Sequence, residues 1–192
     1  VPTDTAMHGA QVSGMLAERF PELASGPLVL LNPNAGDLLP QRRWPLARYV
    51  ELAHLLLARH PQLRIGIIGA QEDAAAAQRL VSEVGSARCA SLAGAFTVAE
   101  LPALFEQSRI LVGNDPGPAH VAALTRTPTL VLFGPETPLL YRPLGKARAL
   151  YAGLPCSPCI RVANQRRSAC QDNLCMQAIG VGSVLEEIEA ML

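Results

Sequence analysis

Short hydrophobic runs recur along the chain at regular intervals and predict its strands. Four runs of four or five mostly aliphatic residues are typical of strands buried on both faces of a parallel sheet. These runs are 28–31, 64–68, 109–112 and 129–133. Two weaker strand signals lie at 89–92 and 147–151.

Helical patterns fill the segments between these runs. Hydrophobic spacing or capping residues predict helices that begin at Pro45, Gln71 and Thr97, and a last helix capped by Ser183. A shorter helix is expected within 115–125. The alternation of short strands with helices predicts an α/β fold, a Rossmann-like parallel sheet with helices on both faces.

The same pattern indicates one domain and a short segment before it. Residues 1–27 carry a helical pattern near 11–20 and are expected to be a linker or lead-in segment. Residues 28–192 are expected to form the domain, including a Cys-rich loop at 154–175 and a C-terminal helix.

Composition narrows the classes of protein that fit. Hydrophobic residues make up 49% of the 192 residues, enough for a folded core, and 16 basic residues balance 16 acidic ones. A neutral balance argues against a surface for nucleic acid or anionic membranes. No hydrophobic run is long enough to span a membrane, and the first residues do not match a signal peptide. We therefore expect no nucleic-acid partner and no transmembrane segment.

Ligands of parallel α/β sheets bind beyond the carboxyl ends of the strands, so the loops there hold the candidate chemistry. After the first run, Asn34, Ala35 and Gly36 expose backbone amides, and Arg42 and Arg43 follow. Backbone amides and a guanidinium are groups that bind a diphosphate. The alternative is a solvated basic turn at a helix start.

Two further loops follow strands. Gln71 and Glu72 lie in the first of these loops and could meet a base or a ribose, and Phe96 lies in the second and could flank a nucleobase. The alternatives are charge pairing at a helix N-terminus near Gln71 and a hydrophobic staple at Phe96. The glycines at 66 and 69 do not match the dinucleotide pattern G-x-G-x-x-G, so an NAD site is not expected.

The segment 113–120, Gly-Asn-Asp-Pro-Gly-Pro-Ala-His, is the most informative part of the chain. Asp115 suits an N-cap, Pro116 or Pro118 suits the first helical position, and Gly117 lets a ligand approach the backbone. His120 would then lie one turn inside a helix start that favours phosphate. The alternatives are that Asp115 only caps the helix and that His120 is satisfied in the core.

Four cysteines near the C-terminus have a spacing that suits a metal. Cys156, Cys159, Cys170 and Cys175 form C-x2-C-x10-C-x4-C, and zinc or iron accepts four thiolates. The alternatives are free thiols or disulfides. Cys89 stands apart and is expected to be a small buried hydrophobic residue.

Five motifs, taken in order, carry a family resemblance. They are 31–36 (Leu-Asn-Pro-Asn-Ala-Gly), 42–45 (Arg-Arg-Trp-Pro), 68–73 (Ile-Gly-Ala-Gln-Glu-Asp), 113–120 and 132–135 (Leu-Phe-Gly-Pro). Their order and spacing resemble glycosyltransferase family nine, the bacterial lipopolysaccharide heptosyltransferases and their relatives, over about residues 28–192. The resemblance implies a two-domain GT-B fold. Its C-terminal Rossmann-like half binds the donor, ADP-heptose, and its N-terminal half binds the acceptor and supplies a catalytic Asp.

The chain resembles the C-terminal, donor-binding half only, and the resemblance implies a role for each candidate residue. Arg42 occupies the place of a phosphate-binding Lys and would stabilise charge in the transition state. Gln71 falls where some members carry a Glu toward the ribose, and Pro116 stands where Ser or Thr is usual. The full set of implied donor-binding residues is Asn34, Ala35, Gly36, Arg42, Gln71, Phe96, Thr97, Asp115, Pro116, Gly117 and His120.

The implied function is transfer of a sugar, expected to be heptose from ADP-heptose, with inversion at the sugar. The acceptor would be a lipopolysaccharide core or another glycan or protein, bound by a missing N-terminal domain, so this chain alone is expected to be inactive. No cofactor is required for transfer, and a structural zinc or iron is expected at the four cysteines, because some autotransporter heptosyltransferases carry iron there. The expected location is cytoplasmic or peripheral at the inner-membrane face. The alternatives are a non-catalytic nucleotide-binding or assembly module with a Cys-rich finger, and a nucleotide-sugar epimerase.

Overall fold

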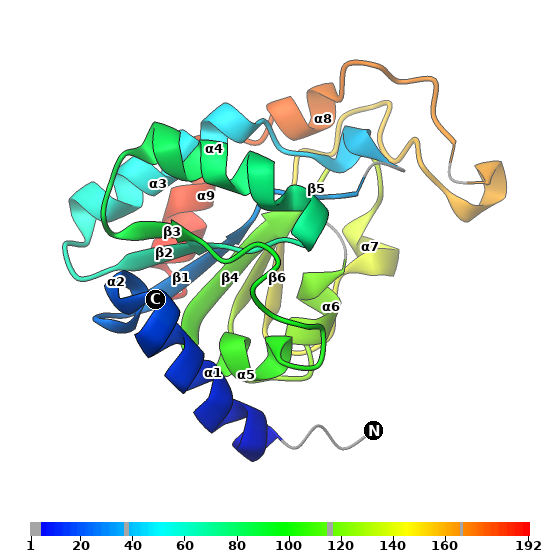
Figure 1. Ribbon diagram of the computed structural model, residues 1–192. Coiled ribbons are helices and arrows are strands. Elements are labelled where there is room, and N and C mark those ends of the chain that lie inside the picture. Colours follow the sequence, from blue (N-terminus) through cyan, green and yellow to red (C-terminus); the bar gives the residue numbers. More distant parts are fainter. Residues whose placement is uncertain (1–4, 37–38, 115–116, 166) are drawn as a thin grey trace.

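One parallel sheet forms the centre of the molecule. The computed structural model describes residues 5–36, 39–114, 117–165 and 167–192. In this part of the chain, the strands are β1 Leu28–Asn32, β2 Arg64–Ile67, β3 Cys89–Ser91, β4 Ser108–Asn114, β5 Thr129–Phe133 and β6 Ala147–Tyr151. They lie in the order β3-β2-β1-β4-β5-β6, and every neighbouring pair is parallel (Figure 1). The predicted α/β fold is confirmed, and each hydrophobic run became a strand.

Helices cover both faces of this sheet. In the described residues they are α1 Thr5–Arg19, α2 Pro21–Ala24, α3 Leu46–Arg59, α4 Ala74–Val84, α5 Leu101–Glu106, α6 Pro118–Ala122, α7 Pro138–Tyr141, α8 Leu174–Gln177 and α9 Val181–Glu189. Side chains alternate along β1, so Val29 and Leu31 join the core with α3, α4 and α9, whereas Leu28 and Leu30 join the core with α1 and α5. Each fully buried leucine contributes about 2 kcal/mol to this packing.

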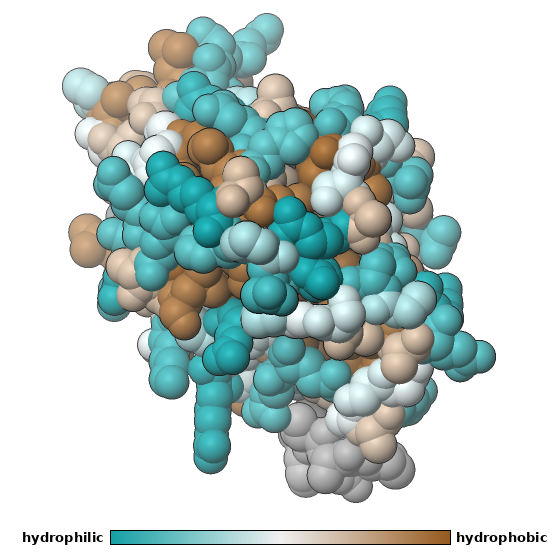
Figure 2. Space-filling model, turned by 90° about the vertical axis from the view of Figure 1, so that its left-hand side faces the viewer, coloured by the Kyte–Doolittle hydropathy of each residue, from teal (hydrophilic) through white to brown (hydrophobic). Residues whose placement is uncertain are grey.

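The outer surface differs from these cores. Hydrophilic residues are spread over the face that is turned toward the viewer in Figure 2, with smaller hydrophobic areas between them. No helix in the described part of the chain is both long and hydrophobic enough to cross a membrane.

The lead-in segment forms a helix that packs against the domain. Helix α1 runs over Thr5–Arg19, so it begins six residues before the weak pattern near 11–20, and it buries Val12 and Leu16 in the core beside α5. The amide of Gln11 donates to Glu100 Oε1 at 3.0 Å, which adds a polar contact between the two elements. Part of the segment expected to be a linker is therefore a packed element of the fold.

Several helix starts differ from the sequence-based expectation. Helix α4 begins at Ala74, after a 3-10 turn that occupies Gln71–Asp73, where the helix was expected to begin. Helix α5 begins at Leu101, because Pro102 lacks an N–H and suits only a first turn, so Thr97 and Glu100 form a separate turn before it. Gly117 and Gly180 take the N-cap positions of α6 and α9. Ser183 therefore lies inside α9, and the prediction that it caps this helix is wrong; Asp115 lies outside the described residues. Pro118 does occupy the first turn of α6, as predicted.

The turn before α5 gives a pH-dependent prediction. The Thr97 backbone amide and hydroxyl each donate to Glu100 Oε2 at 2.8 Å, and these bonds hold the pKa of the buried Glu100 carboxyl below its ordinary value. A carboxyl with a lowered pKa in the folded state stabilises it above the unfolded-state pKa, near 4.3, and loses that contribution as the pH falls through the lowered value. We expect Glu100→Gln to lower the free energy of unfolding by about 1.5 kcal/mol at pH 7.

Urea titrations of both proteins at several pH values measure this difference. It should shrink steadily below about pH 4. A difference that stays constant from pH 7 to pH 3 would contradict the role of the Glu100 charge.

Candidate functional site

The strand order places a topological switch point between β1 and β4. From β1 the chain continues to β2 on one side of the sheet, and from β4 it continues to β5 on the other side. The loops at the carboxyl ends of these two strands therefore diverge and leave a crevice, the usual ligand site of open parallel sheets. The predicted ligand-binding loops 32–44 and 113–120 both follow the switch-point strands.

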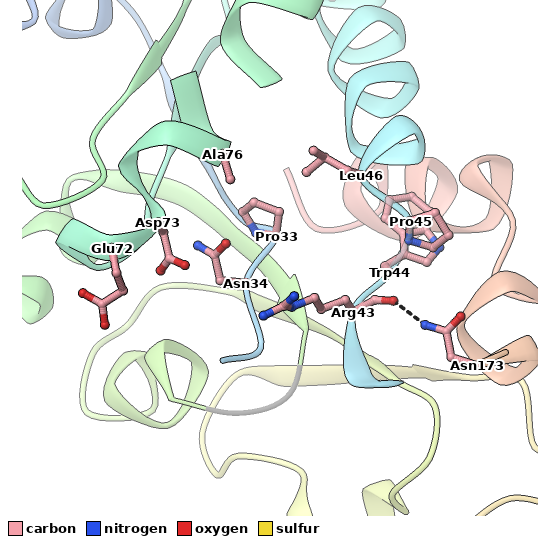
Figure 3. Close-up of a pocket in the computed structure, with 10 residues that line it drawn as sticks. All are labelled: Pro33, Asn34, Arg43, Trp44, Pro45, Leu46, Glu72, Asp73, Ala76 and Asn173. Atoms are coloured by element: carbon pink, nitrogen blue, oxygen red, sulfur yellow. Dashed lines mark hydrogen bonds between the residues drawn. The ribbon is translucent and has the colours of Figure 1, made fainter. Parts of the chain in front are cut away.

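A pocket of about 560 Å³ opens at this edge of the sheet. It is formed by the loop after β1, the start of α3, the turn between β2 and α4, and one residue from the segment before α8. The lining residues, all drawn in Figure 3, are Pro33, Asn34, Arg43, Trp44, Pro45, Leu46, Glu72, Asp73, Ala76 and Asn173.

Opposite charges lie on opposite sides of this pocket. Figure 3 shows the Arg43 side chain reaching across toward Asn34, with the Asp73 and Glu72 carboxylates beyond it. Asp73 Oδ2 accepts from the Ala70 amide at 2.9 Å, which fixes its orientation. Glycine is required at 69, because an added Cβ would lie 2.6 Å from Asn34 Nδ2 and 2.8 Å from Asp73 Cβ.

A buried asparagine at the end of β4 holds the loop that carries the pocket. Asn114 is fully buried, and its Oδ1 accepts from the Trp44 amide at 3.0 Å and from the Tyr49 hydroxyl at 3.1 Å. Its Nδ2 donates to the Pro33 carbonyl at 2.8 Å. The Trp44 ring is buried, and its Nε1 donates to the Ile179 carbonyl at 2.9 Å. These bonds fix Pro33 and Trp44, two walls of the pocket, relative to the sheet.

Arg42 does not line the pocket. Its guanidinium forms an ion pair of 2.5 Å with Glu136, and the two side chains are only 8% and 2% exposed. Arg42 Nε and Glu136 Oε1 are buried and have no hydrogen-bond partner among the described residues. Glu136 follows the Phe-Gly-Pro segment after β5, so the pair links the loop after β1 to the loop after β5.

The other predicted site residues lie in different places, and only some of them are in or next to the pocket. Asn34 lines the pocket, whereas Gln71 is exposed and lies against Gly94, next to the lining residue Glu72. Phe96 is half-buried and packs against the core on the α1 side, which fits the alternative of a packing role. Ala35 and Gly36 are in the loop after β1, and Thr97 holds Glu100.

The second predicted loop is only partly described. Gly117 adopts a φ of +60°, which favours glycine, and both it and His120 are exposed, so His120 is not buried in the core. Helix α6 has only five residues, Pro118–Ala122. Asp115 and Pro116 lie outside the described residues. The donor-binding roles of this loop remain predictions.

Two lining residues lack a sequence signal that would have revealed them. Asn173 Nδ2 donates to the Arg43 carbonyl at 2.8 Å, but it comes from a polar segment with no recognisable motif. Asp73 was expected only as part of a helix start. Arg43, by contrast, was visible in the basic pair before the helix, although the resemblance directed attention to Arg42.

The four clustered cysteines lie in or next to a segment that projects from the sheet (Figure 1). All are free thiols; Cys156 is exposed and Cys175 is buried. Burial raises the pKa of the Cys175 thiol to about 11, with smaller contributions from neighbouring Cys159 and Cys170. Among the described residues, no three His, Cys, Asp or Glu side chains are arranged to hold a metal ion. The zinc or iron site remains a prediction, and Cys89 is buried as expected.

The sequence profile of Glycosyltransferase family 9 (heptosyltransferase) matches residues 2–169. The chain belongs to this family. Lipopolysaccharide heptosyltransferase 2 of Salmonella typhimurium is 31% identical over 140 residues, which cover 71% of this chain and 39% of the relative.

Solved heptosyltransferases share the fold. E. coli ADP-heptose lipopolysaccharide heptosyltransferase II has a TM-score of 0.73 and 24% identity, with 93% of this chain and 50% of that chain covered. E. coli heptosyltransferase WaaC with ADP has a TM-score of 0.66 and 20% identity, with 94% and 49% covered. The likeness confirms the Rossmann-like α/β fold, which this chain shares with part of the GT-B heptosyltransferases. This family 9 chain spans about 40% of the curated relative and about half of each solved chain.

Proposed function

We propose that this chain is the donor-binding domain of a heptosyltransferase-like glycosyltransferase and that its pocket binds a nucleoside diphosphate sugar, with ADP-heptose as the first candidate. The observation that carries the proposal is the pocket at the carboxyl ends of β1 and β2, next to the switch point, with a guanidinium on one side and two carboxylates on the other. The solved relative with ADP supports adenosine diphosphate as the nucleotide.

The charges of the pocket suggest how such a donor would lie. Carboxylates accept hydrogen bonds from ribose hydroxyls in Rossmann-like folds, so Glu72 and Asp73 suit the ribose. A cation suits the diphosphate, so the diphosphate would lie toward the side of the pocket that carries the arginine. The sugar would then extend toward the loop before α6, where Gly117 and His120 are exposed.

Transfer in the full-length enzyme would need groups from the other half. A base there would take the proton of an acceptor hydroxyl, whose oxygen attacks the anomeric carbon. The bond from that carbon to the diphosphate breaks with inversion, and ADP leaves with the electron pair. Arginine in this domain would stabilise the charge that develops on ADP, so the scheme requires no metal. The chain alone would bind the donor without transferring sugar.

Calorimetric titration tests the binding function. We expect the folded chain to bind ADP and ADP-heptose with a dissociation constant below about 1 mM, and adenosine more weakly because it lacks the diphosphate. Incubation with ADP-heptose and a lipopolysaccharide core acceptor should give no transfer. Absence of ADP binding by the folded chain at millimolar ligand would refute the donor-binding function.

The acceptor and the location concern the full-length protein. We propose a lipopolysaccharide core or related glycan acceptor, reached from the inner-membrane face. Leu139, Leu140 and Leu144 are 92%, 76% and 83% exposed, and Arg142 and Lys146 beside them are also exposed, a combination that suits an anionic lipid surface. Full-length protein should sediment with phosphatidylglycerol vesicles more than with phosphatidylcholine vesicles. Equal recovery with both would contradict this location.

A further inference from the structure

Two adjacent arginines precede α3, and the structure gives them different surroundings. Arg42 ends a short 3-10 turn, Pro40–Arg42, whereas Arg43 has extended backbone angles, with φ −75° and ψ 121°. The change of backbone conformation lets the two side chains diverge. Arg42 is directed to Glu136, and Arg43 is directed into the pocket.

The surroundings of Arg42 oppose a direct contact with a ligand. Its guanidinium is almost fully buried and paired with a carboxylate that is 2% exposed. To reach a bound diphosphate it would have to leave Glu136, and that carboxylate would remain buried without a partner, which is strongly unfavourable. The bound diphosphate would also be repelled by the negative charge of Glu136, which Arg42 would no longer neutralise.

The surroundings of Arg43 favour such a contact. Its side chain crosses the pocket, and its guanidinium donates to the Gly36 carbonyl at 2.8 Å (Figure 3). This bond anchors the side chain to the same loop whose Asn34 lines the pocket. A guanidinium carries five N–H donors in a planar fork, so it can hold a carbonyl and also contact an anion.

We infer that Arg43, and not Arg42, is the residue that contacts the anionic end of the donor, and that the Arg42–Glu136 pair is a positioning element. The inference rests on the proposed donor-binding function. The family resemblance implies that Arg42 contacts the phosphate, whereas this inference assigns the contact to the next residue, Arg43. The pair holds the loop after β1 against the loop after β5, and thereby sets where the Arg43 backbone leaves that loop.

Substitution of each arginine in the full chain separates the two assignments. Titrations at low ionic strength with ADP, pyrophosphate and adenosine would compare the unmodified chain with Arg43→Gln and Arg42→Lys. Arg126→Gln is the matched control, because this exposed arginine lies before β5, at the opposite edge of the sheet from the pocket. Circular dichroism would establish that each variant is folded.

We expect Arg43→Gln to weaken the binding of ADP and pyrophosphate about ten-fold or more and to change the affinity for adenosine less than about two-fold. Arg126→Gln should leave all three constants unchanged. In folded Arg42→Lys, which keeps a cation for Glu136, ADP affinity should change less than about three-fold.

Other outcomes overturn the inference. If Arg43→Gln binds ADP like the unmodified chain, Arg43 is not the contact, although the donor-binding function stands. If the unmodified chain binds pyrophosphate as tightly as ADP, the adenosine part contributes nothing and the proposed nucleotide-binding function fails. The role of Arg43 is then decided by the dissociation constants for pyrophosphate alone. If neither ligand binds to the folded chain, both proposals fail.

Discussion

Replacement of Glu136 by alanine is expected to lower the free energy of unfolding by about 3–5 kcal/mol, because it leaves the buried Arg42 guanidinium without its counter-charge. Arg42 Nε already has no hydrogen-bond partner among the described residues, so little else would compensate. The loss should appear as a lower midpoint in chemical denaturation with an unchanged slope.

A second ion pair provides the control for this prediction. Arg148 and Glu187 lie 3.0 Å apart, but their side chains are 54% and 38% exposed. Solvent screens such pairs, so Glu187→Ala should cost less than about 1 kcal/mol. If Glu136→Ala costs no more than Glu187→Ala, the buried pair is not a stabilising link between the two loops.

Replacement of Asn114 by alanine is the second large effect, with an expected loss of about 3 kcal/mol. The change removes the Asn114 partner of the Trp44 amide and of the Pro33 carbonyl, and it leaves the Tyr49 hydroxyl with the Asn32 carbonyl as its acceptor. Each of these groups is buried or partly buried beside the pocket, and a buried polar group without a partner costs about 1–3 kcal/mol. The ADP affinity should fall as well, because Pro33 and Trp44 line the pocket.

Tyr49→Phe is the matched variant for this network. It removes one donor to Asn114, which keeps its bonds to the Trp44 amide and the Pro33 carbonyl. The expected loss is about 1 kcal/mol, with little change in ADP affinity. Denaturation midpoints of the two variants measure the contrast, and equal losses would show that Asn114 does not act as a shared anchor.

The strands could be predicted from the sequence because their signal is local. Short hydrophobic runs such as 28–31 and 129–133 are typical of strands buried on both faces, and their alternation with helices indicates a parallel sheet. Helix starts were less certain. Several residues near each start have capping ability, and the structure has Gly117 and Gly180 at the N-cap positions of α6 and α9.

The site was less accessible to sequence reasoning because its decisive contacts join distant segments. Arg42 and Arg43 are chemically identical neighbours. Only the position of Glu136 in the fold shows that Arg42 forms a buried ion pair while Arg43 lines the pocket. Asn173 likewise reaches the pocket from the far end of the chain. The loops were identifiable because they follow strands at the switch point, but the orientation of individual side chains within them was not.

A crystal structure of this chain soaked with ADP is the most direct test of the account. We expect density for ADP in the pocket after β1, with a diphosphate oxygen about 3 Å from the Arg43 guanidinium and ribose hydroxyls beside Glu72 and Asp73. The Arg42–Glu136 pair should remain intact. ADP bound elsewhere on the domain, or a diphosphate held by Arg42 after separation from Glu136, would contradict it.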